Sequence, residues 1–271
     1  MARTSKKRAR ELKHDKFRDA TLSAFDRLNH RIEGRRRLII YAVAGLAAVA
    51  LAASLWSWWS GQREAEARAA LGRAIQVSEA VVTASPPADS KEPTFPSERE
   101  RAQAALKEFE SVAAKYGDPY DDIARFMAAS QLLSVDRPRA LSELESLSKS
   151  GNDEVAARAT FALAQAREAE KQYDAAVPLY QSLLKDDSGS IPNETVNLRL
   201  ASIYEKQGKK DEAATLLFDM IKKAREAKDK EGKPVPPPAA VSDAADLLRR
   251  IDPTRYDQLP PETPAAGGLP F

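Results

Sequence analysis

The sequence LAQAREAEKQYDAAVPLYQSLL, residues 163–184, recurs in similar form 37 residues later as LASIYEKQGKKDEAATLLFDMI, residues 200–221. Both stretches are rich in strong helix formers, and polar residues interrupt each of them near the middle. Small residues at matching places in two helices allow close packing, and larger residues fill the neighbouring grooves. The two stretches therefore predict two similar helix hairpins, with structural positions at Leu163, Ala164, Ala176, Leu200, Ala201 and Ala213.

The same spacing continues towards the N-terminus, through RAQAALKEF and RPRALSEL. The aligned alanines, Ala105, Ala140, Ala176 and Ala213, are separated by 35, 36 and 37 residues. This pattern resembles the tetratricopeptide repeat, a helix–turn–helix unit of about 34 residues. The prediction is an all-α chain with a tetratricopeptide-like α-solenoid of about four helix hairpins over residues 60–227. A loop at 84–97 splits the first hairpin, whose first helix is expected at 62–83. The alternative is a generic alanine-rich helical bundle.

Three segments follow the repeats. Residues 228–239 contain GKPVPPP and predict a stiff, proline-rich linker. Residues 240–251, AVSDAADLLRRI, predict an amphipathic helix that caps the solenoid with one polar side. Residues 252–271 are rich in proline and glycine, which predicts a disordered tail.

A second feature precedes the repeats: LIIYAVAGLAAVALAASLWSWW, residues 38–59, has no charged residue. A helix of this length rises ~33 Å, about the hydrocarbon thickness of a bilayer. Basic and aromatic residues flank it in the manner of a membrane span: Arg35, Arg36, Arg37, Trp56, Trp58 and Trp59. We expect a transmembrane signal anchor at 38–59. A buried core helix and a cleaved signal peptide are the alternatives.

Charge predicts the orientation of this anchor. Residues 1–37 contain thirteen Lys and Arg against five Asp and Glu, a net charge of +8. The whole chain carries +2, which leaves −6 for residues 38–271. Because basic residues stay on the cytoplasmic side, we expect a single-pass inner-membrane protein with a cytoplasmic N-terminus and a periplasmic C-terminal domain. Lipid would then contact the chain through one span.

Small residues inside the span recur every four positions, at Ala44, Ala48 and Ala52. This spacing lets two membrane helices approach closely, so a dimer through this face is one interpretation. The other is that alanine is simply common in membrane helices.

The basic segment 1–37 also contains apolar residues with helical spacing, Phe17, Leu22, Phe25, Leu28 and Ile32, which predict an amphipathic helix. Three roles remain open for it: fixing the orientation of the anchor, lying on anionic lipid, or docking on a cytoplasmic protein.

Composition argues against catalysis. The chain has no cysteine, and its two histidines, His14 and His30, precede the span. The exported part therefore lacks the residues of serine–histidine or cysteine–histidine catalysis and the usual zinc ligands. Its carboxylates are scattered beside Lys and Arg, as on a solvated helical surface. We expect no enzyme activity, no cofactor, no metal site and no nucleic-acid partner.

The arrangement of residues 35–227 resembles the bacterial inner-membrane tetratricopeptide-like family, which includes the ancillary subunit of the Sec translocon. The resemblance implies a protein–protein interaction module that binds chaperones, the translocon or emerging envelope proteins. The alternative is a structural scaffold subunit of an envelope complex for secretion, division or outer-membrane assembly.

Stacked hairpins present a concave groove lined mainly by the first helix of each pair. The first helices are expected at 120–134, 155–170 and 194–207. The candidate partner-binding residues on them are Arg125, Arg158, Arg167, Asn197 and Tyr204. Tyr204 also fits a packing role, because Asn197, Leu200 and Tyr204 share one helical face.

Overall fold

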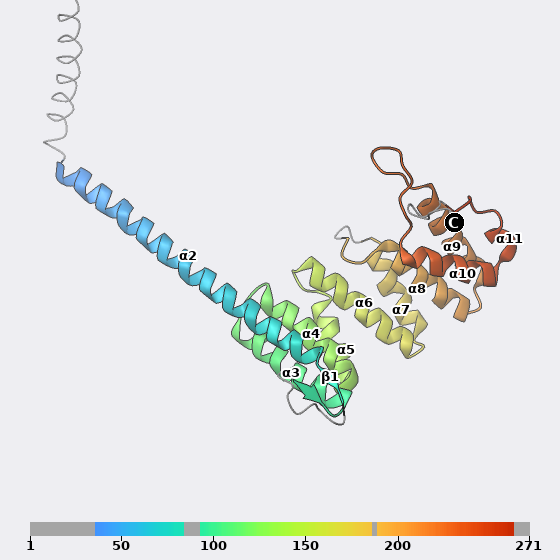
Figure 1. The fold of residues 1–271 in the computed structure, drawn as a ribbon, viewed down its shortest axis with the longest axis horizontal. Helices are drawn as coiled ribbons and strands as arrows, with labels where there is room; N and C mark the ends of the chain where they lie inside the picture. Colours follow the sequence, from blue (N-terminus) through green and yellow to red (C-terminus); the bar gives the residue numbers. More distant parts are fainter. Residues whose placement is uncertain (1–35, 84–92, 186–188, 263–271) are drawn as a thin grey trace, which may run out of the picture. The chain divides into compact units, whose positions relative to one another are not determined.

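The computed structural model describes residues 36–83, 93–185 and 189–262. Contacts divide the chain into two compact units, Met1–Glu66 and Ala67–Phe271. The described helices and strands are α2 Arg36–Ser78, β1 Val81–Val82, β2 Thr94–Phe95, α3 Glu98–Lys115, α4 Tyr120–Val135, α5 Arg137–Leu147, α6 Asp153–Ala169, α7 Tyr173–Leu183, α8 Asn193–Lys206, α9 Lys210–Glu226, α10 Ala239–Ile251 and α11 Pro253–Tyr256 (Figure 1).

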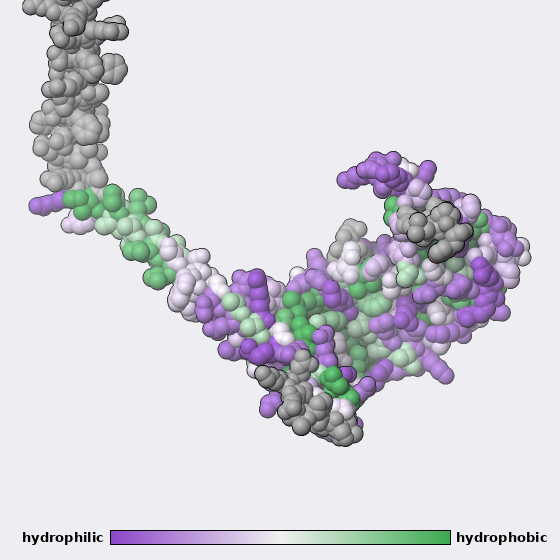
Figure 2. Space-filling view, viewed as in Figure 1, coloured by the Kyte–Doolittle hydropathy of each residue, from purple (hydrophilic) through white to green (hydrophobic). Residues whose placement is uncertain are grey.

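Helix α2 carries the apolar stretch of the first unit. Among the described residues it is the one helix long and apolar enough to cross a membrane. The large apolar side chains described between Leu38 and Trp59 are exposed (Figure 2), Trp56, Trp58 and Trp59 among them. The Arg63 guanidinium lies 4.7 Å from the centre of the Trp59 ring. This is a cation–π contact within α2, on the C-terminal side of the apolar stretch.

The extent of α2 corrects one boundary. We expected the anchor at 38–59 and the first repeat helix at 62–83 as separate segments, but one continuous helix, α2, runs through both as far as Ser78. The physical reason is that residues 60–78 contain no proline and many helix formers, so nothing ends the helix after the tryptophans. Arg36 and Arg37 begin the helix. Arg35 and the amphipathic segment before it lie outside the described residues.

The second unit is an all-α solenoid. Each helix from α3 to α11 packs against the next one in the chain, and three pairs of alternate helices, α4 with α6, α8 with α10 and α9 with α11, also touch. Hairpins α4/α5, α6/α7 and α8/α9 therefore stack in order, and Figure 1 shows them as a series from green to orange. The aligned positions are all buried: Ala105, Ala140, Leu163, Ala164, Ala176, Leu200, Ala201 and Ala213.

The first hairpin pairs the end of α2 with α3. Ala74 of α2, Ala105 and Phe109 of α3 and Ala128 of α4 form one buried cluster. The helix expected at 62–83 ends at Ser78, and Val81–Val82 instead pairs in parallel with Thr94–Phe95. Two short strands thus close part of the loop expected at 84–97, and residues 84–92 of that loop lie outside the described residues. Ser97 then caps α3 by accepting a hydrogen bond from the Glu100 amide.

The C-terminal segments differ from the expected linker and tail. The first half of the linker folds back on itself, because the Asp229 carboxylate accepts hydrogen bonds from the amides of Glu231 and Lys233. Helix α10 follows, at Ala239–Ile251. The tail was expected to be disordered, but Pro253–Tyr256 forms α11, and Tyr256 and Leu259 pack against the core of α8, α9 and α10. Because these two side chains pack against the core, this part of the proline-rich segment is ordered. Residues 263–271 lie outside the described residues.

Candidate partner-binding grooves

A groove of about 590 Å³ lies between α8 and α10, the first helices of successive units. We call it the first-helix groove. Leu198 and Leu247 are its apolar lining, and the polar and small residues around them are Thr195, Arg199, Ser202, Ala240, Asp243, Asp246 and Arg250. Its dimensions and its mixed chemistry suit a short protein segment with both apolar and charged side chains.

Helical periodicity places these residues on one face. Thr195, Leu198 and Ser202 recur at spacings of three and four, opposite the buried Val196, Leu200 and Ile203. In α10 the groove residues similarly lie away from Val241, Ala244 and Leu248, which are buried against α9. Burial of one side of each helix thus leaves the other side free to form the groove.

The charges in the groove are incompletely paired. Arg250 donates to the carboxylate of Glu205 at 3.0 and 3.1 Å. The carboxylate of Asp243 has no ion pair or hydrogen bond among the described residues. Arg199 lies 4.0 Å from the Glu168 carboxylate, which has a closer cation in Lys206. Arg199 and Asp243 are therefore available to a partner at little cost in existing contacts.

Glu168 is a charged residue that the solenoid buries, with an exposed side-chain fraction of 8 %. Its carboxylate accepts hydrogen bonds from Tyr180 Oη at 3.1 Å and Lys206 Nζ at 2.9 Å. Burial raises the pKa of the Tyr180 phenol above its ordinary value, and the neighbouring Glu168 charge raises it further. The phenol thus remains a donor, and the cluster joins α6, α7 and α8.

The structure does not bring the five sequence candidates together in one groove. Arg125 donates to Glu143 of α5 at 2.8 Å, and Arg167 donates to Gln172 in the turn after α6 at 2.9 Å. Asn197 is half-buried. Tyr204 packs against two core clusters and lines a different groove, between α7 and α9. Arg125 also lines a separate groove of about 480 Å³ with residues of α3 and α5, so these candidates are spread over different faces of the solenoid.

Arg158 is the exception. It is exposed on α6 and pairs with Glu154 at 2.7 Å. Because Ala164 aligns with Ala201, Arg158 occupies the place that Thr195 has in α8. Arg158 therefore extends the face of the first-helix groove onto the preceding hairpin.

Sequence reasoning missed the residues that line the groove, above all Leu198, Arg199 and Asp243. A signal for them was present in the periodicity. Once Val196, Leu200 and Ile203 are assigned to the core, the opposite face of α8 must contain Thr195, Leu198 and Ser202. The contribution of α10 was hidden, because that helix was considered only as a cap.

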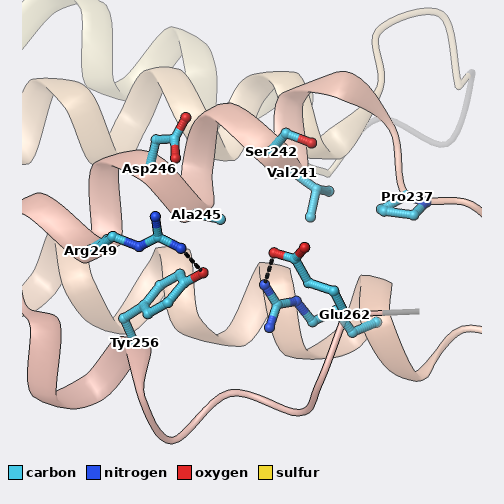
Figure 3. A pocket seen from close by; sticks show the side chains of 9 residues that line it. Pro237, Val241, Ser242, Ala245, Asp246, Arg249, Tyr256 and Glu262 are labelled. Carbon is cyan, nitrogen blue, oxygen red and sulfur yellow. Dashed lines mark hydrogen bonds and ion pairs between the residues drawn. The ribbon is translucent and has the colours of Figure 1, made fainter. Parts of the chain in front are cut away.

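A smaller cavity of about 230 Å³ lies on the other side of α10, against α9 and the tail (Figure 3). Its lining includes Val241, Ala245 and Asp246 of α10. Two contacts to tail residues cross it: the hydroxyl of Tyr256 accepts from Arg249, and the carboxylate of Glu262 accepts from Arg225. The tail therefore already occupies much of this site. Among the described residues no cluster of His, Cys, Asp or Glu could hold a metal ion.

Two family models described as tetratricopeptide repeat match the chain, one at residues 136–191 and the other at 168–229. These ranges cover helices α5 to α9, where the stacked hairpins are most regular. No curated protein and no solved structure matches the chain in these comparisons. Tetratricopeptide repeats generally bind other proteins and generally act as non-enzymatic scaffolds. The chain thus carries the repeats of a protein–protein interaction module.

Proposed function

We propose that the chain is a membrane-anchored interaction module whose first-helix groove receives a segment of a partner protein. The observation that carries this proposal is the groove itself, which combines the apolar Leu198 and Leu247 with the uncommitted charges of Arg199 and Asp243. A segment with an apolar anchor between charged residues would match it. Arg158 extends the same face and is proposed as a further contact, whereas Arg125, Arg167 and Tyr204 already make contacts within the solenoid.

The proposed location is the inner membrane, with residues 1–37 in the cytoplasm and the solenoid in the periplasm. Its basis is the net charge of +8 before the apolar stretch against −6 in the remainder. The partners in that location would be chaperones, the translocon or emerging envelope proteins. A fusion after Phe271 to a reporter that is active only outside the cytoplasm should be active. An inactive fusion with normal expression would reverse the proposed orientation.

Site-directed photocrosslinking in intact cells tests the groove. A photoreactive residue at Ser202 should crosslink to envelope proteins, whereas the same residue at the exposed Lys107 of α3 should not. Adding Arg199→Gln and Asp243→Arg should abolish the Ser202 crosslinks with little change in the thermal melt, because both side chains are exposed and Glu168 keeps its closer cation, Lys206. Crosslinks from Ser202 that survive both changes would contradict the proposal. A broad ladder of products indicates many clients, and a single stoichiometric band indicates a fixed scaffold.

A further inference from the structure

The tail that follows α10 is fixed by one nearly buried cation. The side chain of Arg225, near the end of α9, is only 7 % exposed. Its guanidinium donates to the carbonyl oxygen of Pro260 at 2.6 Å and to the carboxylate of Glu262 at 2.8 Å. The ring of Tyr256 lies 5.9 Å from the same guanidinium. Among the described residues, every polar or ring contact of this guanidinium thus comes from residues 256–262.

A buried cation without partners is strongly unfavourable, so these contacts are worth more than a surface ion pair. The same segment also contributes apolar packing, because Tyr256 and Leu259 cover the core formed by α8, α9 and α10. We call residues 253–262 the strap. Figure 3 shows Glu262 and Tyr256 of the strap facing α10, one on each side of the cavity.

Helix α10 lies between the strap and the first-helix groove. It contacts α8, α9 and α11. Asp246 of α10 lines both the groove and the strap cavity, while Asp243 and Leu247 face the groove and Val241 and Ala245 face the cavity. One side of α10 therefore forms a wall of the first-helix groove, and the strap covers the other side.

We propose that the strap, held by the Arg225–Glu262 pair, positions α10 and thereby controls access of partners to the first-helix groove. This inference rests on the proposed function of that groove. Arg225 and Glu262 are positioning residues, because neither lines the groove. When the pair is broken, the strap leaves α10, the groove wall becomes mobile and the partner segment loses one side of its site.

The chain offers a matched control for Glu262. Glu231 is also 71 % exposed and pairs with Lys233 at 2.7 Å, but Lys233 is itself exposed. Glu262→Gln and Glu231→Gln thus remove the same charge from two equally exposed glutamates, of which only one holds a buried cation. A simple effect of net charge would be the same in both variants.

The test has a readout that needs no partner. Since the chain has no cysteine, Leu247→Cys gives a single thiol on the groove wall, at a side chain that is nearly buried. In the full chain in detergent, Glu262→Gln should raise the maleimide labelling rate at this thiol about fivefold. The loss of one net hydrogen bond changes the equilibrium between the closed and the open strap by about that factor. Glu231→Gln should leave the rate unchanged. Exchanging the charges in Arg225→Glu with Glu262→Arg should restore part of the protection relative to Arg225→Glu alone.

The second readout is the Ser202 photocrosslink. Glu262→Gln should lower it while Glu231→Gln leaves it at the parent level. Equal labelling rates in Glu262→Gln and Glu231→Gln would show that the strap does not position α10, and this conclusion does not depend on partner binding. Faster labelling with an unchanged crosslink would overturn the control of partner access. If Ser202 of the parent crosslinks to nothing, the proposed function of the groove fails, and the labelling rates alone still decide whether the strap positions α10.

Discussion

Hairpins α6/α7 and α8/α9 share one template but bury their equivalent glutamates to different degrees. Glu168 and Glu205 are 37 residues apart, like the buried pairs Ala164 with Ala201 and Ala176 with Ala213. The side chain of Glu168 is 8 % exposed, and that of Glu205 is 26 % exposed. The Glu168 carboxylate accepts hydrogen bonds from Tyr180 and Lys206, whereas the Glu205 carboxylate accepts from Arg250.

The difference originates in the second helices. Tyr180 and Leu217 are also 37 residues apart and both fully buried, but only tyrosine can donate to the glutamate of its own hairpin. The hairpin with tyrosine can therefore bury its carboxylate, while the hairpin with leucine leaves its carboxylate at the rim of the first-helix groove. The backbone repeat is thus set by the small residues, and the polar chemistry of each unit by one residue of its second helix.

Substitutions at the small-residue positions that both hairpins share should have the largest effect on stability. Ala176→Leu and Ala213→Leu should each lower the free energy of unfolding by about 1–3 kcal/mol, because a larger side chain at a closed helix crossing overpacks it. Thermal melts of the full chain in detergent, followed by circular dichroism, measure the change. Ala175→Leu is the matched control, since Ala175 is the exposed neighbour of Ala176. Equal melts for Ala175→Leu and Ala176→Leu would contradict the common template.

The polar difference should be the next largest effect. Tyr180→Phe should lower the free energy of unfolding by about 1–2 kcal/mol, because Glu168 loses a donor inside the core. Chemical denaturation measures it. Tyr173→Phe is the control, because the Tyr173 hydroxyl has no hydrogen bond in the described part of the chain. An equal loss in Tyr173→Phe would mean that the hydrogen bond from Tyr180 to Glu168 is not what distinguishes the two hairpins.

High pH should remove the stability that the Tyr180 hydroxyl contributes. The pKa of Tyr180 is raised in the folded chain, so its contribution is fully present below the unfolded value of about 10 and is lost as pH rises towards the folded value. The stability difference between the parent and Tyr180→Phe should be constant up to about pH 10 and then narrow by about 1.4 kcal/mol per pH unit. Melts at a series of pH values measure it. A difference that widens above pH 10 would contradict the raised pKa.

The sequence predicts the backbone of these hairpins better than their surfaces. Small and large apolar residues at fixed spacings are enough to predict an all-α solenoid, and the repeat-family matches confirm that class. We did not expect the anchor and the first repeat helix to form one helix, although nothing in their helix propensity would stop α2 before Ser78. The strap was missed because its order depends on Arg225, which is distant in sequence and has no local signature.

The residues of the candidate site were likewise predictable from the sequence only in part. Arg125, Arg167 and Tyr204 were chosen for residue type on the expected first helices, but type does not reveal which side of a helix a neighbour covers. Arg125 is committed to Glu143, and Tyr204 to two core clusters. Leu198 and Ser202 are found once the core face of α8 is known, because periodicity then fixes the opposite face. The α10 side of the groove required tertiary structure.

A smaller contrast lies in the turns that join the helices. Lys171 and Gly208 occupy equivalent positions with φ of 60° and 79°, a region that favours glycine. Lys171→Gly should raise the free energy of unfolding by about 0.5–1 kcal/mol, and Gly208→Ala should lower it by about 1 kcal/mol. A Cβ at Gly208 would meet no atom within 4 Å, so only the backbone strain contributes. Melts of both variants measure it, and a shift of the same sign in both would contradict this assignment.

The smallest effect on stability should come from Glu205. Glu205→Gln should lower the free energy of unfolding by less than about 0.5 kcal/mol, because its partner Arg250 is mostly exposed and solvent screens the pair. Glu168→Gln should cost more, since its carboxylate is buried and receives two donors. Chemical denaturation of both variants measures the two costs, and added salt should reduce the Glu205 effect further. Equal costs would mean that burial does not distinguish the two glutamates. A small cost at Glu205 would fit a carboxylate at the rim of a groove, where Arg250 can exchange it for an acidic group of a partner without loosening the fold.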